Sequence, residues 1–236
     1  MITLRKSLER GHAHHGWLDS FHSFSFADYF DPAHMGWGNL RVINEDVVEG
    51  HRGFGMHPHR DMEIVTWMLA GELTHRDSLG HGATLRAGEV QRMSAGTGVR
   101  HSEMNAADTP AHLLQIWMLP HERNLPPSYD QQAVPDAALR GRLHLLGAPA
   151  GSADAAGATL TLNADVRLHA GRFDGAEQAT LALDPARKAY VQVARGRLVV
   201  NGLALQAGDA LAIEDEPRLD FGQGLDAEVL VFDLQP

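Results

Sequence analysis

The chain of 236 residues contains no cysteine, so disulfide bridges, cysteine-bound zinc or iron–sulfur centres and thiol catalysis are all excluded. It also lacks an apolar run long enough to span a membrane, and residues 1–6 carry charge and lead into no apolar stretch. No basic run accompanies the net charge of -10, which disfavours contact with nucleic-acid phosphates. We therefore expect a cytoplasmic protein that binds neither a membrane nor nucleic acid directly.

Patterns of helical length are scarce as well, whereas 24 glycines and 11 prolines separate short apolar runs that are typical of strands. Residues 64–69 and 113–118 are clear examples, each ended by a glycine or proline turn. Asn201-Gly202 lies between two apolar runs and predicts a two-residue hairpin, while residues 135–140 predict one short helical turn. Many short strands with regular turns predict an all-β sandwich or barrel.

A faint internal repeat predicts two related lobes. Residues 64–73 resemble residues 189–198, and residues 85–90 resemble residues 205–210. Both pairs have the pattern of a strand, a glycine turn and a second strand, and the second copy has the shorter hairpin.

Between the two copies lies a polar stretch with three prolines, residues 121–140. We expect the boundary there, and we assign residues 1–130 to the first domain and residues 131–236 to the second.

Two short motifs place metal-ligand residue types at positions i and i+2: His57 with His59, and His101 with Glu103. Alternate residues of a strand point to the same face, so two neighbouring strands would bring three imidazoles and one carboxylate together. Such a set suits a divalent transition metal with positions left open for substrate. Pro58 cannot donate a hydrogen bond in a central ladder, so it either breaks the strand and leaves His57 and His59 in a loop, or lies in an edge strand or at a bulge, which we expect.

Through the repeat, other residue types replace these candidate ligands in the second domain: Ala182, Asp184, Phe221 and Gln223. The second domain is therefore predicted to have lost its metal site.

The other candidate residues have interpretations that compete. A dense N-terminal cluster is interpreted as a solvated segment, in preference to a metal or proton relay at the entrance of the site: His12, His14 and His15. Four histidines have no partner at ligand spacing and are interpreted as surface or core residues: His75, His81, His112 and His121. Three residues are expected either near the pocket or, for the two phenylalanines, in the interface between the lobes: Asp19, Phe24 and Phe26.

Two polar residues near the motifs have structural interpretations. Gln91 is interpreted as a strand residue, in preference to a hydrogen-bonding group behind the ligands. Glu63 is interpreted as a group that supports the ligands or the fold, and not as a ligand. Residues 94–98 lack the Gly-Lys-Ser/Thr ending of a phosphate loop and are interpreted as the tight turn before His101.

Several motifs together resemble the pirin family. They are Gly11-His-Ala-His-His-Gly-Trp-Leu-Asp-Ser20, Phe24-Ser-Phe26, His57-Pro-His59-Arg-Asp-Met-Glu63, and Ser94-Ala-Gly-Thr-Gly98 with His101-Ser-Glu103. The resemblance is specific over residues 1–120 and loose from residue 140 onward. It implies a bicupin, in which two jelly-roll-like β-barrels face each other and only the first binds metal.

The four ligands of the family fall on His57, His59, His101 and Glu103. Bacterial pirins with quercetin 2,3-dioxygenase activity are the nearest likeness, which implies a metal-dependent enzyme that opens a flavonol or a similar catechol-type substrate with O2. We expect Fe(II), although the donor set also accepts copper, nickel, manganese, cobalt and zinc. A divalent ion would lower the pKa of a substrate hydroxyl, and Glu103 is expected to act as the catalytic base that takes its proton.

Two other functions stay open on the sequence. Pirins are also known as metal-dependent modules that contact transcription regulators or metabolic enzymes, and in that role the oxygenase activity is incidental. The acidic charge suits a protein partner. A metal-dependent hydrolase or isomerase would use the same fold without O2. We expect a monomer, because two barrels in one chain already bury the surface that single cupins bury by dimerising.

Overall fold

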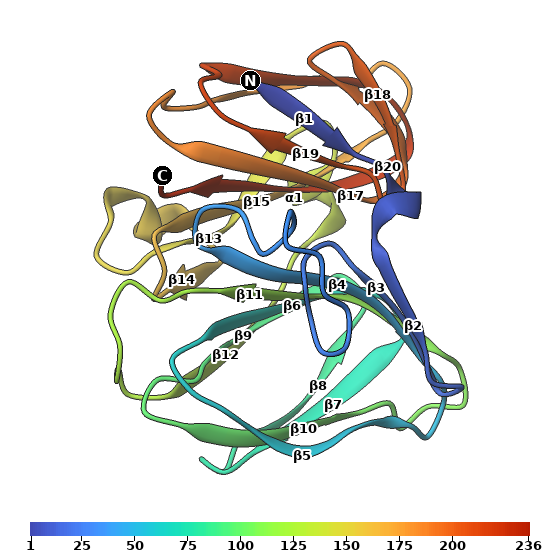
Figure 1. Ribbon diagram of the computed structural model, residues 1–236, viewed down its shortest axis with the longest axis vertical. Helices are drawn as coiled ribbons and strands as arrows, with labels where there is room; N and C mark the ends of the chain where they lie inside the picture. The colour runs from blue at the N-terminus through green and yellow to red at the C-terminus, as the bar shows by residue number, and fades with distance from the viewer.

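Short apolar segments between glycine and proline turns form twenty strands in the computed structural model, which describes residues 1–236. Helix is confined to α1 (Asp136–Leu139) and to two 3-10 turns, Ser7–Glu9 and Ala153–Gly157. The chain is an all-β bicupin whose two lobes are stacked along the long axis (Figure 1). None of its helices is long and apolar enough to cross a membrane.

The first lobe consists of two antiparallel sheets that face each other. The larger sheet has the order β12-β9-β6-β11-β4-β3-β2. Its strands are β2 (Gly11–His14), β3 (Leu18–His22), β4 (Leu40–Val48), β6 (Glu63–Ala70), β9 (Glu89–Ser94), β11 (Ala111–Met118) and β12 (Ser128–Ala133). The smaller sheet has the order β5-β10-β7-β8. Its strands are β5 (Gly53–His59), β7 (Glu72–Asp77), β8 (Gly82–Arg86) and β10 (Val99–Met104).

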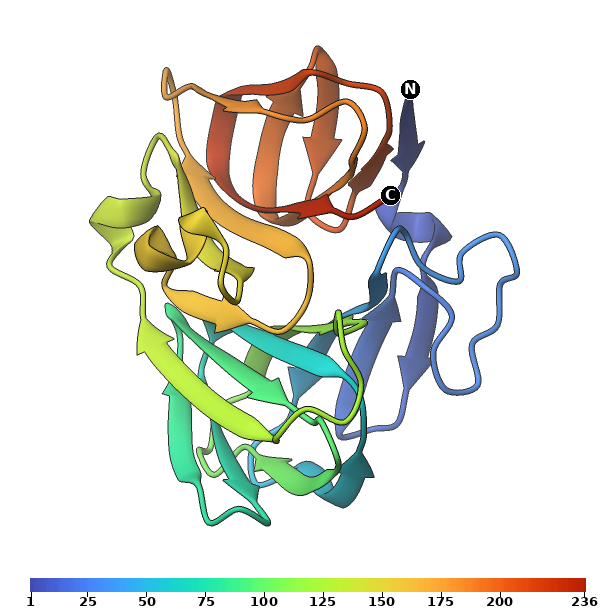
Figure 2. The ribbon, with the colours of Figure 1, turned by 90° about the vertical axis from the view of Figure 1, so that its left-hand side faces the viewer.

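The second lobe is one curved sheet, whose strands close around a core of their own (Figure 2). Its members are β1 (Ile2–Arg5), β13 (Leu143–Pro149), β14 (Leu160–Leu162), β15 (Val166–Phe173), β16 (Ala179–Ala182), β17 (Lys188–Val200), β18 (Leu203–Gln206), β19 (Ala210–Ile213) and β20 (Arg218–Leu234). The predicted hairpin joins β17 to β18, with Asn201 and Gly202 at φ 45° and 80°, as a two-residue turn requires. The N-terminal strand β1 pairs with β19, so the first few residues belong to the sheet of the second lobe.

The largest hydrophobic cluster lies between the lobes. It joins Leu40 and Trp67 of the first lobe to Tyr190 and Phe232 of the second. Strand β6 is therefore buried on both faces, which explains why Thr66 is the only polar residue between Ile64 and Leu69. The indole N–H of Trp67 donates a hydrogen bond of 2.6 Å to Glu228 across the interface. The larger sheet of the first lobe thus has one face on the second lobe and leaves its other face for a cavity.

Replacement of Trp67 by alanine is expected to lower the free energy of unfolding by about 3–5 kcal/mol, because a fully buried indole leaves a cavity between the lobes. Urea unfolding followed by circular dichroism measures this loss. Leu8→Ala is the control, because Leu8 is 97% exposed and its loss is expected to change the free energy by no more than about 0.5 kcal/mol. Equal stabilities of the two variants would contradict a stabilising interface at Trp67.

Candidate metal centre and its cavity

The two sheets of the first lobe enclose a cavity of about 710 Å³. Its walls are mainly apolar and include Trp17, Leu18, Phe26, Phe54 and Trp117. Both sheets contribute, because alternate residues of β3, β4 and β11 point inward from one side and those of β5 and β10 from the other. A cavity of this size and character is typical of a site for a small organic ligand.

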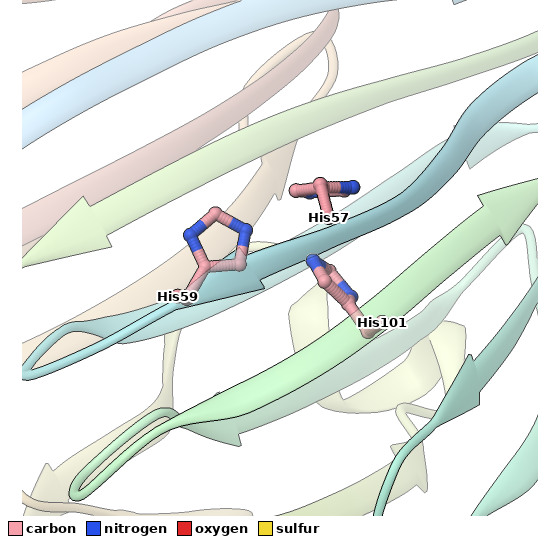
Figure 3. A group of neighbouring side chains, drawn as sticks. All are labelled: His57, His59 and His101. Carbon is pink, nitrogen blue, oxygen red and sulfur yellow. The ribbon is translucent and has the colours of Figure 1, made fainter.

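Three imidazoles come together at the wall formed by β5 and β10 (Figure 3). His57 lies directly opposite His101 in the antiparallel register. The ring centroids are 4.4 Å apart for His57 and His101, and 4.8 Å apart for His59 and each of the other two. Pro58 causes no conflict, because β5 is an edge strand, as the sequence predicted.

The protonation of these rings suits metal binding. His57 Nδ1 lies 2.7 Å from the carbonyl oxygen of Gly55 and so carries the proton, which leaves the lone pair of Nε2 free to bind a metal. Burial, together with the neighbouring imidazoles, lowers the pKa of His59 to about 4 and that of His101 to about 3. His101 Nε2 is buried and has no hydrogen-bond partner. Three imidazoles whose ring nitrogens lie within 4.8 Å of one another fit a divalent transition metal.

Glu103 follows His101 on β10 but is held differently. Its two carboxylate oxygens accept hydrogen bonds from the side-chain amides of Gln91 at 2.8 Å and Gln115 at 2.9 Å. The pairing of β10 with β5 shifts in register between His101 and Glu103. A ligand atom of Glu103 lies within 4.8 Å of those of His101 and His75, and this group shares His101 with the three-histidine cluster. The structure thus brings the three histidines together and places the carboxylate beside His101.

Gln91 was interpreted as a strand residue in preference to a hydrogen-bonding group behind the ligands. In the structure its side-chain amide donates directly to Glu103, which matches the less favoured interpretation. Phe26 lines the cavity with its ring 5.3 Å from that of Trp117, whereas Phe24 packs against Tyr190 between the lobes. The two phenylalanines, equivalent in the sequence pattern, take opposite places because adjacent segments of the chain face different lobes.

The N-terminal histidines are exposed, as expected, but they also line the outer part of the cavity: His12, His14 and His15. His12 Nε2 lies 2.6 Å from Asp19, which does not line the cavity. Glu63 lies on the face of β6 that looks toward the second lobe, where it accepts hydrogen bonds from the Ser94 hydroxyl and the Asn163 backbone. Its role is structural.

The glycines of the turn at residues 94–98 are required by its backbone geometry. Gly96 has φ 45°, and a Cβ atom at this position would lie 1.9 Å from the carbonyl oxygen of Leu125. Only glycine fits there without moving the backbone. The turn leads from β9 into β10 and so brings His101 to the cavity.

Two residues that the sequence analysis missed belong to this site. Asp46 lines the cavity and accepts a hydrogen bond from the Ser20 hydroxyl. His75 is buried next to His101, although it was interpreted as a surface or core residue without a partner. The available signals were a polar alternation inside an apolar strand, Asn44 with Asp46, and a further pair at i and i+2, His75 with Asp77.

Burial, reinforced by the charge of Glu103, raises the pKa of Asp46 to about 7. In the unfolded chain an aspartate ionises near pH 4, so between about pH 4 and 7 unfolding releases a proton. The stability of the wild type relative to Asp46→Asn is therefore expected to fall as the pH rises through this range and to level off above it. Urea midpoints of both metal-free proteins across this range measure the difference. A difference that is independent of pH, or that rises with pH, would contradict the neutral form of Asp46.

The chain matches two protein-family models and is similar to several known proteins. The family model described as Pirin matches residues 3–118, and the model described as Quercetinase C-terminal cupin domain matches residues 150–234. A protein of Escherichia coli (strain K12) named quercetin 2,3-dioxygenase is 46% identical over 237 residues, with both chains covered in full. A pirin-like protein of Caulobacter vibrioides is 39% identical, over 97% of this chain and 98% of its own.

Among solved structures, the bacterial pirin YhhW from Escherichia coli in complex with nickel(II) superposes with a TM-score of 0.92. It is 44% identical, and the match covers 100% of each chain. The resemblance that the sequence motifs carried is confirmed over both lobes, and the chain belongs to the pirin family.

Proposed function

We propose that this protein is a metal-dependent dioxygenase that opens a flavonol such as quercetin with O2. The observation that carries the proposal is the convergence of three imidazoles, with a carboxylate beside them, on a largely apolar cavity of about 710 Å³. Further support comes from the E. coli relative named quercetin 2,3-dioxygenase. The cavity is large enough for a flat ligand of three rings.

The proposed metal ligands are His57, His59, His101 and Glu103, and the proposed ion is Fe(II). The nickel complex of the E. coli pirin supports binding of one divalent transition metal. The bound ion would supply a Lewis acid for a substrate hydroxyl and redox chemistry toward O2.

Glu103 is proposed as the base that takes the hydroxyl proton at a carboxylate oxygen. The amides of Gln91 and Gln115 hold this carboxylate in the buried wall, so its direction is set before substrate arrives. The aromatic walls at Phe26 and Trp117 would hold the substrate rings and exclude water from the reacting atoms.

We further propose that the first domain, residues 1–130 without β1, carries the metal and that the second, residues 131–236, is degenerate. Strand β1 lies in the sheet of the second lobe, and β12 crosses the predicted boundary to complete the sheet of the first. In the second lobe Phe221 packs against Phe173 inside the hydrophobic core, which suits a structural role. A monomer is the proposed form, because the large apolar interface already lies within one chain.

The proposal is tested by oxygen uptake. Metal-free protein is loaded anaerobically with Fe(II) or Ni(II), transferred to an oxygen electrode and mixed with quercetin. Uptake that depends on both metal and quercetin is the expected result. Tight binding of metal without uptake would overturn the proposed oxygenase activity.

A further inference from the structure

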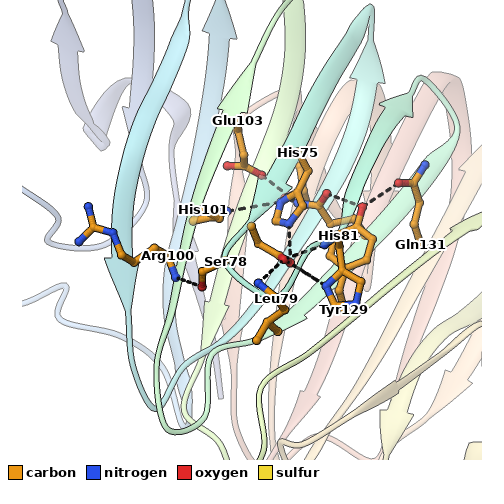
Figure 4. A network of polar contacts seen from close by, with 12 residues as sticks. His75, Ser78, Leu79, His81, Arg100, His101, Glu103, Tyr129 and Gln131 are labelled. Atoms are coloured by element: carbon orange, nitrogen blue, oxygen red, sulfur yellow. Dashed lines mark hydrogen bonds and ion pairs between the residues drawn. The ribbon is translucent and has the colours of Figure 1, made fainter.

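His101 of the three-histidine cluster also belongs to a polar network that includes His75, His81 and Tyr129 (Figure 4). His75 of β7 lies beside His101 of β10, and both side chains are 1% exposed. Their Nδ1 atoms are 3.5 Å apart, at the long end of the hydrogen-bond range. On the other side of its ring, His75 Nε2 lies 3.1 Å from Asp77 Oδ2. The three residues form a continuous chain that ends at His101 Nε2, the buried nitrogen without a partner.

Asp77 is fixed as the acceptor at the far end of this chain. Burial alone would raise the pKa of its carboxyl, but hydrogen bonds from His75, from His81 and from two backbone N–H groups hold that pKa below its usual range. The exposed ring of His81 lies 2.9 Å from Asp77 Oδ2 and connects the chain to solvent. A carboxylate here can only accept, so the proton of a neutral His75 ring is placed on Nε2.

The tautomers along the chain then follow in order. With its proton on Nε2, His75 offers the lone pair of Nδ1 and accepts from His101 Nδ1. With its proton on Nδ1, His101 presents the lone pair of Nε2. We propose that His75 and Asp77 are positioning residues of the metal site, which hold His101 in the tautomer that ligates through Nε2. This inference rests on the metal site of the proposed function.

The same buried wall also reaches the carboxylate. Tyr129 of β12 stacks on His75 with ring centroids 4.5 Å apart. Its hydroxyl lies 3.1 Å from Gln91 Oε1, and the Gln91 amide donates to Glu103. His75 therefore contacts His101 directly and reaches Glu103 through Tyr129 and Gln91. Loss of its two ring nitrogens is expected to weaken metal binding more than it destabilises the fold.

The decisive variant is Asp77→Asn, which preserves shape. The oxygen of the new amide would accept from the backbone N–H groups, so its NH2 group would face His75 Nε2. His75 Nε2 must then accept a hydrogen bond from this NH2 group, so the ring proton of His75 moves to Nδ1. His75 Nδ1 then donates to His101 Nδ1, which leaves the proton of His101 on Nε2. A proton on Nε2 blocks metal binding by that nitrogen. The expected loss of Ni(II) affinity is roughly 10- to 100-fold, the range seen when hydrogen-bond partners of metal ligands are removed. His75→Phe keeps the stacked ring, removes the chain and is expected to weaken Ni(II) binding similarly.

The control is Asp31→Asn. Asp31 also accepts from a histidine, His34, at 2.7 Å and from a backbone N–H, but neither residue lines the cavity. Ni(II) affinity is measured by competition with a chelator, and thermal unfolding verifies that each variant is folded. Heteronuclear NMR of the imidazole nitrogens in metal-free protein reports the tautomer of His101 directly, which a merely structural role of Asp77 would not change.

The expected pattern is a proton on His101 Nδ1 in the wild type and in Asp31→Asn, a proton on Nε2 in Asp77→Asn, and weaker Ni(II) binding in Asp77→Asn and His75→Phe only. Folded Asp77→Asn and His75→Phe proteins that bind Ni(II) as tightly as the wild type would overturn the inference. A wild type that binds Ni(II) with the expected pattern but consumes no oxygen would support it while overturning the proposed oxygenase function.

Discussion

Replacement of His101 by alanine is expected to remove the metal and, with it, turnover. His101 lies opposite His57 in the β5–β10 register, and its ring is the member of the cluster that contacts both other imidazoles and His75. Loss of a direct ligand is expected to exceed the roughly 10- to 100-fold cost in affinity of losing a group behind a ligand. Metal content after dialysis, measured by mass spectrometry, and oxygen uptake with quercetin should both fall to background.

The matched control for this variant is His112→Ala. His112 is a half-buried histidine of the first lobe that pairs with Glu45 and does not line the cavity. It is expected to keep metal and turnover. A His101→Ala protein that retains full metal content and activity would contradict the assignment of the site.

Replacement of Glu103 by glutamine is expected to lower kcat by about 100- to 10,000-fold, the usual contribution of a positioned acid or base. In the wild type, the Glu103 carboxylate accepts hydrogen bonds from two side-chain amides, those of Gln91 and Gln115. A glutamine at position 103 has one oxygen and one NH2 group, so one of the two neighbouring amides must turn over or lose its partner. The variant therefore loses the base and also disturbs the group that orients it. Steady-state oxygen uptake measures kcat, and metal content is followed in the same samples.

Glu63→Gln separates the loss of a base from the loss of a buried carboxylate. Glu63 is 1% exposed and hydrogen-bonded, but it faces the second lobe. Its variant is expected to keep kcat even if stability falls. Undiminished kcat in Glu103→Gln protein with its metal retained would exclude Glu103 as the base.

Local sequence patterns predicted the parts of the fold and site that depend on local geometry. The alternation of a strand is enough to put His57 and His59 on one face, and the Asn201-Gly202 pair is enough for a hairpin. Of the two positions expected for Pro58, an edge strand or a bulge, the structure shows the edge strand, because proline limits backbone pairing wherever it occurs.

Contacts between strands distant in sequence were not predictable in this way. The role of His75 depends on the pairing of β7 with β10, and that of Asp46 depends on which face of β4 looks into the cavity. The separate destinations of Phe24 and Phe26 depend on how the lobes pack. The pairing of β1 with β19 joins residues more than two hundred positions apart, for which short motifs carry no signal.

If the proposed metal site inserts O2 into a flavonol, the atoms of isotopically labelled O2 must appear in the product. Metal-loaded protein is supplied with quercetin under labelled gas, and the product is analysed by mass spectrometry. We expect a ring-opened product that carries both labelled atoms and does not form with metal-free protein. A product that carries no label, with oxygen released as peroxide or not consumed at all, would contradict the proposed insertion.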